Sequence, residues 1–491
     1  MMRPLKLIKT VWAATVLAAL LVAAGPGHAQ TVMPLVSFAT TNGAYPEANL
    51  TPGPDGNFYG TTSLGGSFGY GTVFKVTTNG VLTTLVNFNN TNGANPMASL
   101  TLGADGNFFG TTYGLPGSTR TGTVFKVTTN GVLTTLVNFN NTNGAKPNAS
   151  LTLGADGNFY STTWGGGSSD KGTVFKVTTN GVLTTLVNFT SANGANPEAN
   201  LTLGSDGNFY GTTWGGGSSG NGTVFKVTTN GALTTLVNFN NTNGANPYAG
   251  LIVGADGNFY GTTDGGGSSV YGTVFKVTTN GTLTTLVSFT SANGANPDAS
   301  LTLGADGNFY GTTSGGGSSG DGVIFRLNLP PESINRLGNQ SAIIGGSVTF
   351  TSQPFGTAPF GYQWLSNGIP IAGATGPALT VNNVTPALAT NAQYQVVVTN
   401  AWGSLTSSVV RIQLSPAFYL TANSSGGGFT NKQFRFTLTG PAGSNAVIAA
   451  STNLLTWTPL VTNPLVSGTL SFTDAVATNF PRRFYRASLT P

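Results

Sequence analysis

The chain has 491 residues, with no cysteine and a single histidine, His28. Because His28 falls in a segment that we predict is removed on export, the mature protein is expected to contain neither residue. Ser-His-Asp and Cys-His nucleophile systems are then impossible. Zinc, haem and iron–sulfur sites of the usual kinds lack their ligands. We therefore predict no catalytic residue, no metal site and no cofactor, and a fold stabilised without disulfides.

Charged side chains are also scarce, at 7% of the residues. The formal net charge of +5 falls to +2 when Arg3, Lys6 and Lys9 leave with the N-terminal segment (5 − 3 = 2). Binding to nucleic acid or to an anionic membrane needs a basic stripe, and none is visible. We predict no nucleic-acid partner.

Long apolar runs are missing outside the N-terminus. There, three basic residues precede an apolar run at residues 11–24, whose 14 residues are fewer than the roughly 20 that a bilayer span needs. Small residues at positions 27 and 29 suit cleavage after Ala29. Residues 1–29 are therefore a predicted signal peptide. We expect a secreted or cell-surface protein without a transmembrane span.

A repeat of about 50 residues is the main feature that is present. The stretch "DGNF" recurs at a spacing of 50 or 51 residues, beginning at Asp55, Asp105, Asp156, Asp206, Asp256 and Asp306. Each unit holds four short strand-like runs rich in Thr, Val and Phe. Asp-Gly and Asn-Gly pairs separate runs in the way that tight hairpin turns do. Each unit is thus predicted to form four antiparallel strands, which cannot bury their faces without neighbouring units.

The chain begins with the end of a unit and finishes its repeats with an incomplete one. Residues 33–38, "MPLVSF", match the unit ending "TTLVNF", and the sixth unit stops near Leu327 without that ending. If the N-terminal segment pairs with the sixth unit, the ring closes. We therefore predict an all-β fold with a six-bladed β-propeller at residues 33–328, closed by the N-terminal strand. An open β-solenoid or other stacked array is the alternative.

The repeats resemble the GloVer family of tandem repeats, which occurs in secreted bacterial proteins. The resemblance rests on "GNFYGTT", on the glycine cluster after it and on "GTVFKVTTNG". It implies export and association with a surface, and no particular chemistry.

Two further β domains are predicted after a linker at residues 329–340. Residues 341–414 resemble an immunoglobulin-like domain through "GGSVTF", "YQWLSNG" with Trp364 at the core position, and Tyr394 two residues before Val396, which replaces the usual second cysteine. Residues 416–491 are predicted to form a small C-terminal β domain. Its "FPRRFYRASL" ending carries the one basic cluster of the chain and resembles terminal modules of exported proteins.

A candidate binding surface follows from the positions that differ between repeats. Such positions cluster in two loops of each unit. These are the crossing loop between units, with sequences such as "NNTNGANP", and the glycine loop, with sequences such as "GGGSS". We place both kinds of loop on one side of the ring. The residues that we predict to form an aromatic and carboxylate patch there are Trp164, Trp214, Glu198, Tyr248, Asp264 and Tyr271. Flat rings beside polar groups suit a glycan or a protein ligand. The plainer interpretation is that these side chains only cover neighbouring loops.

We predict an exported, monomeric, non-catalytic binding or adhesion protein. One alternative is a carbohydrate-active hydrolase, which needs two carboxylates roughly 5 to 10 Å apart. Its candidate acids are Glu47, Glu198, Asp264 and Asp298, of which Glu47 and Asp298 would be neighbours in a closed ring. The other alternative is a passive structural component of the cell surface or matrix. The six "DGN" aspartates are attributed to turn formation and not to calcium.

Overall fold

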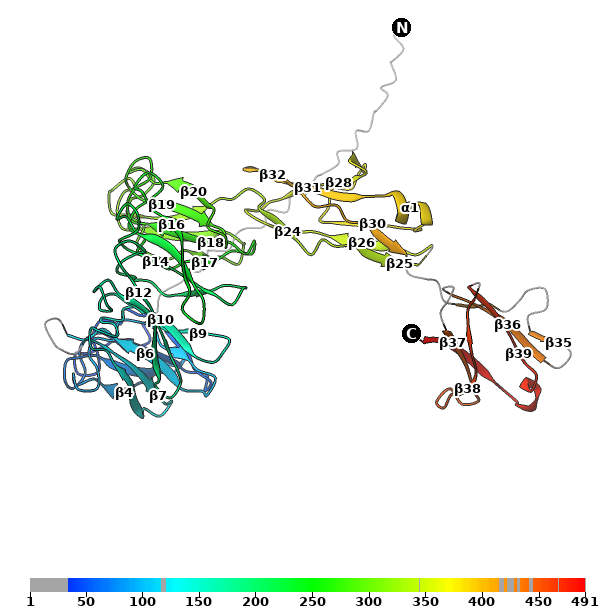
Figure 1. Cartoon of the computed structure of the whole chain (residues 1–491), viewed down its shortest axis with the longest axis horizontal. Coiled ribbons are helices and arrows are strands. Elements are labelled where there is room, and N and C mark those ends of the chain that lie inside the picture. The colour runs from blue at the N-terminus through cyan, green and yellow to red at the C-terminus, as the bar shows by residue number, and fades with distance from the viewer. Residues whose placement is uncertain are drawn as a thin grey trace, which may run out of the picture.

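The computed structural model describes residues 34–115, 121–343, 345–414, 419–421, 428–430, 433–440, 445–466 and 468–490. The predicted signal peptide lies outside the described residues. Apart from one short α-helix and one 3-10 turn, the elements formed by the described residues are β-strands (Figure 1). The predicted all-β class is therefore confirmed.

Each of the first five repeats forms a four-stranded antiparallel sheet in chain order, and the sixth forms three strands. The first repeat has β1 (Thr51–Pro52), β2 (Phe58–Thr62), β3 (Thr72–Val76) and β4 (Leu82–Asn87). The second has β5 (Thr101–Leu102), β6 (Phe108–Thr112), β7 (Thr123–Val127) and β8 (Leu133–Asn138). The third has β9 (Thr152–Leu153), β10 (Phe159–Thr163), β11 (Thr173–Val177) and β12 (Leu183–Asn188). The fourth has β13 (Thr202–Leu203), β14 (Phe209–Thr213), β15 (Thr223–Val227) and β16 (Leu233–Asn238). The fifth has β17 (Ile252–Val253), β18 (Phe259–Thr263), β19 (Thr273–Val277) and β20 (Leu283–Ser288), and the sixth β21 (Thr302–Leu303), β22 (Phe309–Thr313) and β23 (Val323–Leu327).

The "DGN" stretch forms the turn before the second strand of each repeat. In the fourth repeat, Asp206 Oδ1 accepts a hydrogen bond from the Asn208 backbone N–H (3.1 Å), and the Tyr210 hydroxyl donates to Asp206 Oδ2 (2.8 Å). Burial alone would raise the pKa of Asp206, but the hydrogen bonds from Asn208 and Tyr210 outweigh it and lower the pKa. Gly207, with φ of 75°, supplies the left-handed residue of the turn. The Asp206 carboxylate therefore stabilises the turn through its hydrogen bonds.

Successive sheets stack through aromatic side chains. Tyr160 of the third repeat stacks on Phe209 of the fourth with 4.1 Å between ring centroids, and Phe189 meets Phe225 edge-on at 5.1 Å. The Phe225 ring also lies over Gly211, where a Cβ would come within 2.6 Å of Cζ. The glycine of "FYGTT" thus makes room for the phenylalanine of "TVFKV". Each interface is a separate apolar core shared by two neighbouring repeats.

The prediction of a closed six-bladed propeller is wrong. The sixth sheet has only three strands, and residues 34–39 form no strand. Ile324 of β23 is 82% exposed, whereas its counterpart Val274 in the fifth repeat is 0% exposed. Among the residues that the structure describes, no other sheet therefore covers the outer face of the sixth one. The repeats instead follow one another in an open, curved row from blue to green (Figure 1).

The ring is open because the rotations between successive sheets do not bring β23 to the N-terminal segment, which packs on the first repeat. Phe38 meets Phe74 edge-on at 5.0 Å, as Phe88 meets Phe125 at 5.2 Å one repeat later. The N-terminal segment thus makes with the first repeat the same aromatic contact that the end of the first repeat makes with the second. Nothing in that contact requires the two ends of the array to meet.

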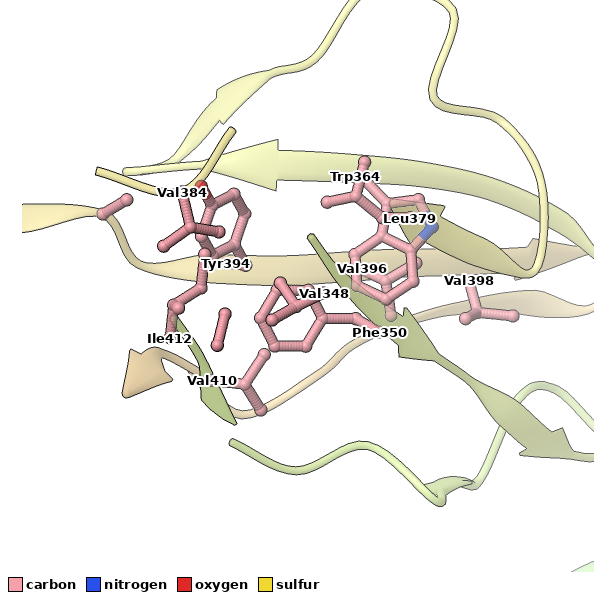
Figure 2. Packing of buried hydrophobic residues seen from close by; sticks show 12 residues of the cluster. Val348, Phe350, Trp364, Leu379, Val384, Tyr394, Val396, Val398, Val410 and Ile412 are labelled. Atoms are coloured by element: carbon pink, nitrogen blue, oxygen red, sulfur yellow. The ribbon is translucent and has the colours of Figure 1, made fainter. Parts of the chain in front are cut away.

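An immunoglobulin-like domain follows the repeats. Its elements are β24 (Ser333–Asn335), β25 (Gln340–Ala342), β26 (Val348–Thr351), β27 (Gln353–Phe355), β28 (Gly361–Ser366), β29 (Ile369–Pro370), β30 (Ala378–Val381), α1 (Pro386–Asn391), β31 (Tyr394–Asn400), β32 (Gly403–Thr406) and β33 (Ile412–Leu414). β26 pairs with β30, a second sheet has the order β29-β28-β31-β32, and β25 pairs with β33 in parallel. Trp364 lies in the core, opposite Val396 on the neighbouring strand (Figure 2).

The junction between the repeats and this domain is packed. Leu329 and Phe355 are buried in the same apolar cluster as Phe309 of the sixth repeat. Lys276 of the fifth repeat forms an ion pair with Glu332. The Asn400 side chain donates to the Leu329 carbonyl at 2.8 Å. Residues at the start of the predicted linker therefore pack against the interface between the fifth and sixth repeats and leave the outer face of the sixth sheet uncovered.

The C-terminal part forms two further sheets. Its elements are β34 (Tyr419–Thr421), β35 (Gly428–Thr430), β36 (Gln433–Thr439), β37 (Asn445–Ser451), β38 (Thr458–Pro464), β39 (Thr469–Asp474), η1 (Ala477–Asn479) and β40 (Phe484–Thr490). β36 pairs with β34, β35 and β39, and β37 lies between β38 and β40. In the basic cluster, Arg483 pairs with Asp474 at 3.0 Å and Arg486 lies over the Trp457 ring. Both guanidinium groups are thus engaged within the domain.

Candidate functional site

The loop side of the array is organised by repeated backbone hydrogen bonds. The backbone N–H of Trp164 donates to the carbonyl of Lys146 (3.1 Å), and the Asn196 side chain donates to the carbonyl of Trp164 (3.0 Å). The residue after each "TT" pair is therefore held between two successive crossing loops. In the fourth repeat, Trp214 is held in the same way between Asn196 and Asn246.

Glu198 lies at the centre of a cluster that joins three repeats. Asn148, which precedes the third repeat's strands, donates its side-chain amide to Glu198 Oε2 at 3.2 Å. Trp164 of the third repeat and Tyr248 of the fifth also lie near enough to this carboxyl group to lower its pKa. We call Asn148, Trp164, Glu198 and Tyr248, together with Lys146, the Glu198 cluster.

The carboxyl group of Glu198 is half-buried. Burial raises the pKa of Glu198, although hydrogen bonds from Asn148, Trp164 and Tyr248 oppose this effect. The negative charge of Glu198 in turn raises the pKa of Tyr248. A partly desolvated acceptor therefore lies between an indole and a phenol, an arrangement that suits hydrogen bonding to a ligand.

Lys146 is a member of this cluster that the sequence prediction missed. Its amine lies 4.8 Å from the centroid of the Trp164 ring, within cation–π distance. Its backbone has φ of 56°, and the equivalent positions with the same conformation carry Tyr45 in the first repeat and Asn95, Asn196, Asn246 and Asn296 in the others. Asparagine adopts this left-handed conformation far more readily than lysine. A lysine in this asparagine position was the available sequence signal.

A hollow of about 330 Å³ lies beside Trp164 in the third repeat. Lys146, Trp164 and Asp170 line it together with the glycine loop at residues 165–167. Asp170 Oδ1 accepts a hydrogen bond from the Gly166 backbone N–H at 2.8 Å. The hollow therefore combines an aromatic face, a cation and a carboxylate.

Asp264, another residue of the predicted patch, meets Asp298 of the sixth repeat. Burial raises the pKa of Asp264, and a hydrogen bond with Asp298 raises it further. The two positions are 34 residues apart, as Trp164 and Glu198 are. The same contact between neighbouring repeats thus brings together an indole and a carboxyl in one place and two carboxyls in the other.

The remaining predicted residues are exposed on the array. Trp214 is 44% exposed and Tyr271 is 39% exposed. The contacts that hold them in place are backbone hydrogen bonds with Asn196 and Asn296. Of the six predicted residues, the structure therefore brings Trp164, Glu198 and Tyr248 into one cluster.

Among the acids considered for the hydrolase alternative, Asp264 and Asp298 are close enough that Asp298 helps to raise the pKa of Asp264. A glycosidase needs two acids roughly 5 to 10 Å apart on either side of the sugar bond. Glu47 and Asp298 belong to opposite ends of an open array, so the closed-ring argument for that pair no longer holds. Among the described residues, no group of three or more acidic or other metal-ligating side chains could hold a metal ion.

The fold and the site define a tandem-repeat protein with immunoglobulin-like β structure. The family described as Gloeobacter/Verrucomicrobia repeat matches residues 25–204 and 193–352, more than half of the chain. The chain belongs to this family. This confirms the resemblance that the repeats show in sequence. No curated protein matches the chain.

Several solved structures match small parts of the chain. "Tandem Ig repeats of Dlar" aligns at 14% identity and a TM-score of 0.16, covering 24% of this chain and 66% of that one. "Sidekick-1 immunoglobulin domains 1-5" aligns at 13% identity and 0.17, covering 33% and 34%. The N-terminal four Ig domains of Dscam1 align at 19% identity and 0.17, covering 29% and 36%. TM-scores this low support no conclusion about function.

The described residues contain no helix with the length and apolar character that a bilayer span requires.

Proposed function

We propose that this protein is an exported, non-catalytic binding or adhesion protein whose repeat array binds a glycan at the Glu198 cluster. The observation that supports this most directly is the convergence of Asn148, Trp164 and Tyr248 on the carboxyl group of Glu198. These side chains come from successive repeats at positions that the repeat geometry leaves free to vary. They are not needed to form any single sheet.

The chemistry of the cluster suits a sugar. An indole face packs against the C–H face of a pyranose ring, and neighbouring carboxyl, amide and phenol groups accept or donate hydrogen bonds to its hydroxyls. The hollow beside Trp164, with a volume of about 330 Å³, is of the size found in small-ligand sites. The adjacent ammonium group of Lys146 would favour a sugar that carries a carboxylate or an electronegative substituent.

A glycan array followed by calorimetry on the glycans that bind tests this function. We expect Trp164→Ala to weaken binding about tenfold or more, because it removes the aromatic face, at a cost of about 1.4 kcal/mol per tenfold. Phe68→Ala is the matched control. Phe68 is an exposed aromatic residue in the glycine loop of the first repeat, outside the cluster, and its loss should leave affinity unchanged.

Each other outcome contradicts part of the proposal. A folded protein that binds no glycan would favour a passive structural component. Release of shorter sugars from a bound glycan, lost in Glu198→Gln, would favour the hydrolase alternative. Equal losses in Trp164→Ala and Phe68→Ala would place the binding site elsewhere.

Binding is also expected to depend on pH. Because burial raises the pKa of Glu198, this carboxyl group takes up a proton at a higher pH than an ordinary glutamate does. Protonation removes the charge that accepts hydrogen bonds from a sugar. Affinity should therefore fall as the pH is lowered through the raised pKa, and Glu198→Gln should bind weakly at every pH. Calorimetry from neutral to acidic pH measures this, and a flat profile for the unaltered protein would contradict it.

A further inference from the structure

The C-terminal end of the repeat array has a strand edge with which no described residue pairs. β23 pairs with β22 on one side, whereas its counterparts in the first five repeats also pair with a fourth strand. Beside this free edge lies a groove of about 310 Å³, lined in part by Val287, Phe289, Phe325 and Trp402. Unpaired backbone groups beside apolar side chains favour the addition of a strand.

The face of the sixth sheet is also uncovered. Ile324 is 82% exposed and Leu303 is 39% exposed. At the position of Ile324, Val224 and Val274 of the preceding repeats are fully buried by the next sheet. This end of the array therefore has the surface of an interface between repeats, without the next repeat.

The N-terminal end has the complementary surface. Residues 35–38, "LVSF", occupy the place that residues 85–88, "LVNF", occupy in front of the second repeat. The Phe38–Phe74 rings meet at 5.0 Å and 66°, and the Phe88–Phe125 rings at 5.2 Å and 63°. The Leu35 carbonyl also lies against Gly80 as the Leu85 carbonyl lies against Gly131. This segment is thus placed as the fourth strand of a preceding sheet whose other three strands are missing.

We propose that the chain associates head to tail, with residues 35–38 of one copy pairing with the free edge of β23 in a second copy. The register follows from the fifth repeat, where Val274 pairs with Val287 and Thr273 with Ser288. By equivalence, Val36 lies opposite Ile324 and Ser37 opposite Val323. Pro34 has no N–H to donate, which confines the added strand to the residues after it.

The occupant is a second copy because the two surfaces complement each other and no described residue of the same chain pairs with either of them. Once the strand is added, the first repeat of one copy stacks on the sixth repeat of the other. This is the contact that joins successive repeats within the chain. Because two different surfaces meet in this contact, a pair of chains still has an unused N-terminal segment on one copy and an unused β23 edge on the other. Further copies can therefore add. The outcome differs from the monomer predicted from the sequence.

Sedimentation of the purified full chain over a wide range of concentrations tests the proposal. We expect species larger than a single chain whose proportion rises with concentration. Ile324→Lys should abolish them, because a lysine would replace a side chain that the contact buries; in the single chain it lies in water and should not affect folding. Val36→Lys should abolish them from the other end, and its unchanged melting temperature would show that the repeats remain folded.

Mixing the two variants gives the most specific result. The Ile324→Lys chain keeps a working N-terminal segment, and the Val36→Lys chain keeps a working β23 edge. The mixture should form a one-to-one pair and nothing larger. A single-chain species at every concentration would overturn the proposal, and so would association that survives Ile324→Lys. Two folded variants that fail to pair with each other would overturn it as well.

Discussion

Trp364→Ala is expected to unfold the immunoglobulin-like domain at temperatures where the unaltered protein is folded. The Trp364 side chain is 0% exposed and packs against Phe350 and Val396 (Figure 2). Its indole N–H donates to the carbonyl of Gly376 at 3.0 Å. Removing a buried tryptophan costs about 3–5 kcal/mol through lost burial and the cavity that remains.

The loss of stability matters because no disulfide contributes to the stability of this domain. Immunoglobulin domains with a disulfide retain a constraint on the unfolded chain of about 2–4 kcal/mol, and this chain contains no cysteine. A loss of this size is a large share of the 5–15 kcal/mol that separates folded from unfolded states in typical domains. Differential scanning calorimetry of the full chain should show one transition moving to lower temperature.

Two variants serve as controls for this experiment. Trp364→Phe keeps most of the packing and loses the hydrogen bond to Gly376, so we expect a loss of about 1–2 kcal/mol. Trp402→Ala removes a tryptophan that is 44% exposed in the same domain, and should change stability by less than about 1 kcal/mol. Equal effects of Trp364→Ala and Trp402→Ala would contradict the core position that we assign to Trp364.

Phe225→Ala is expected to divide the repeat array into two parts that unfold separately. The Phe225 side chain is fully buried and packs in the apolar cluster that joins the third and fourth repeats. Its loss costs about 3–5 kcal/mol. Because each repeat contacts only its neighbours, stability is approximately a sum of terms for repeats and interfaces. Weakening one central interface should therefore convert the single denaturant transition of the repeat array into two.

The same residue in the last repeat is the matched control. Phe325 is only half-buried, because the sixth repeat has no fourth strand. Phe325→Ala should therefore cost about 1–2 kcal/mol and leave one transition. Urea denaturation followed by circular dichroism distinguishes these results. A single unshifted transition in Phe225→Ala would show that the interface contributes little.

Local features of the fold could be predicted from the sequence because they depend on near neighbours. The Asp-Gly and Asn-Gly pairs specify turns, and the alternation in "GTVFKV" specifies a strand. The structure has four-stranded sheets with these turns in each of the first five repeats. In the immunoglobulin-like domain, the pairing of Trp364 with Val396 could be predicted because it depends on two neighbouring strands.

The candidate site could be predicted only in part. Trp164, Glu198 and Tyr248 are found in one cluster because they vary between repeats at positions that lie next to each other in the array. Trp214 has the same sequence character and is not in that cluster. Lys146 departs from the asparagine found at this position in four other repeats, but its place beside the Trp164 ring depends on the fold of the crossing loop.

The sequence by itself determined the repeat period, the turns, the strands and the family. The tertiary structure alone decided whether the repeats close into a ring and which loop side chains meet. The "MPLVSF" segment matches a fourth strand equally well in a closed propeller and in an open row, since both arrangements use the same contact with the first repeat. Small rotations between neighbouring sheets add up along the array, and their sum decides whether the ends meet. No single repeat encodes that sum.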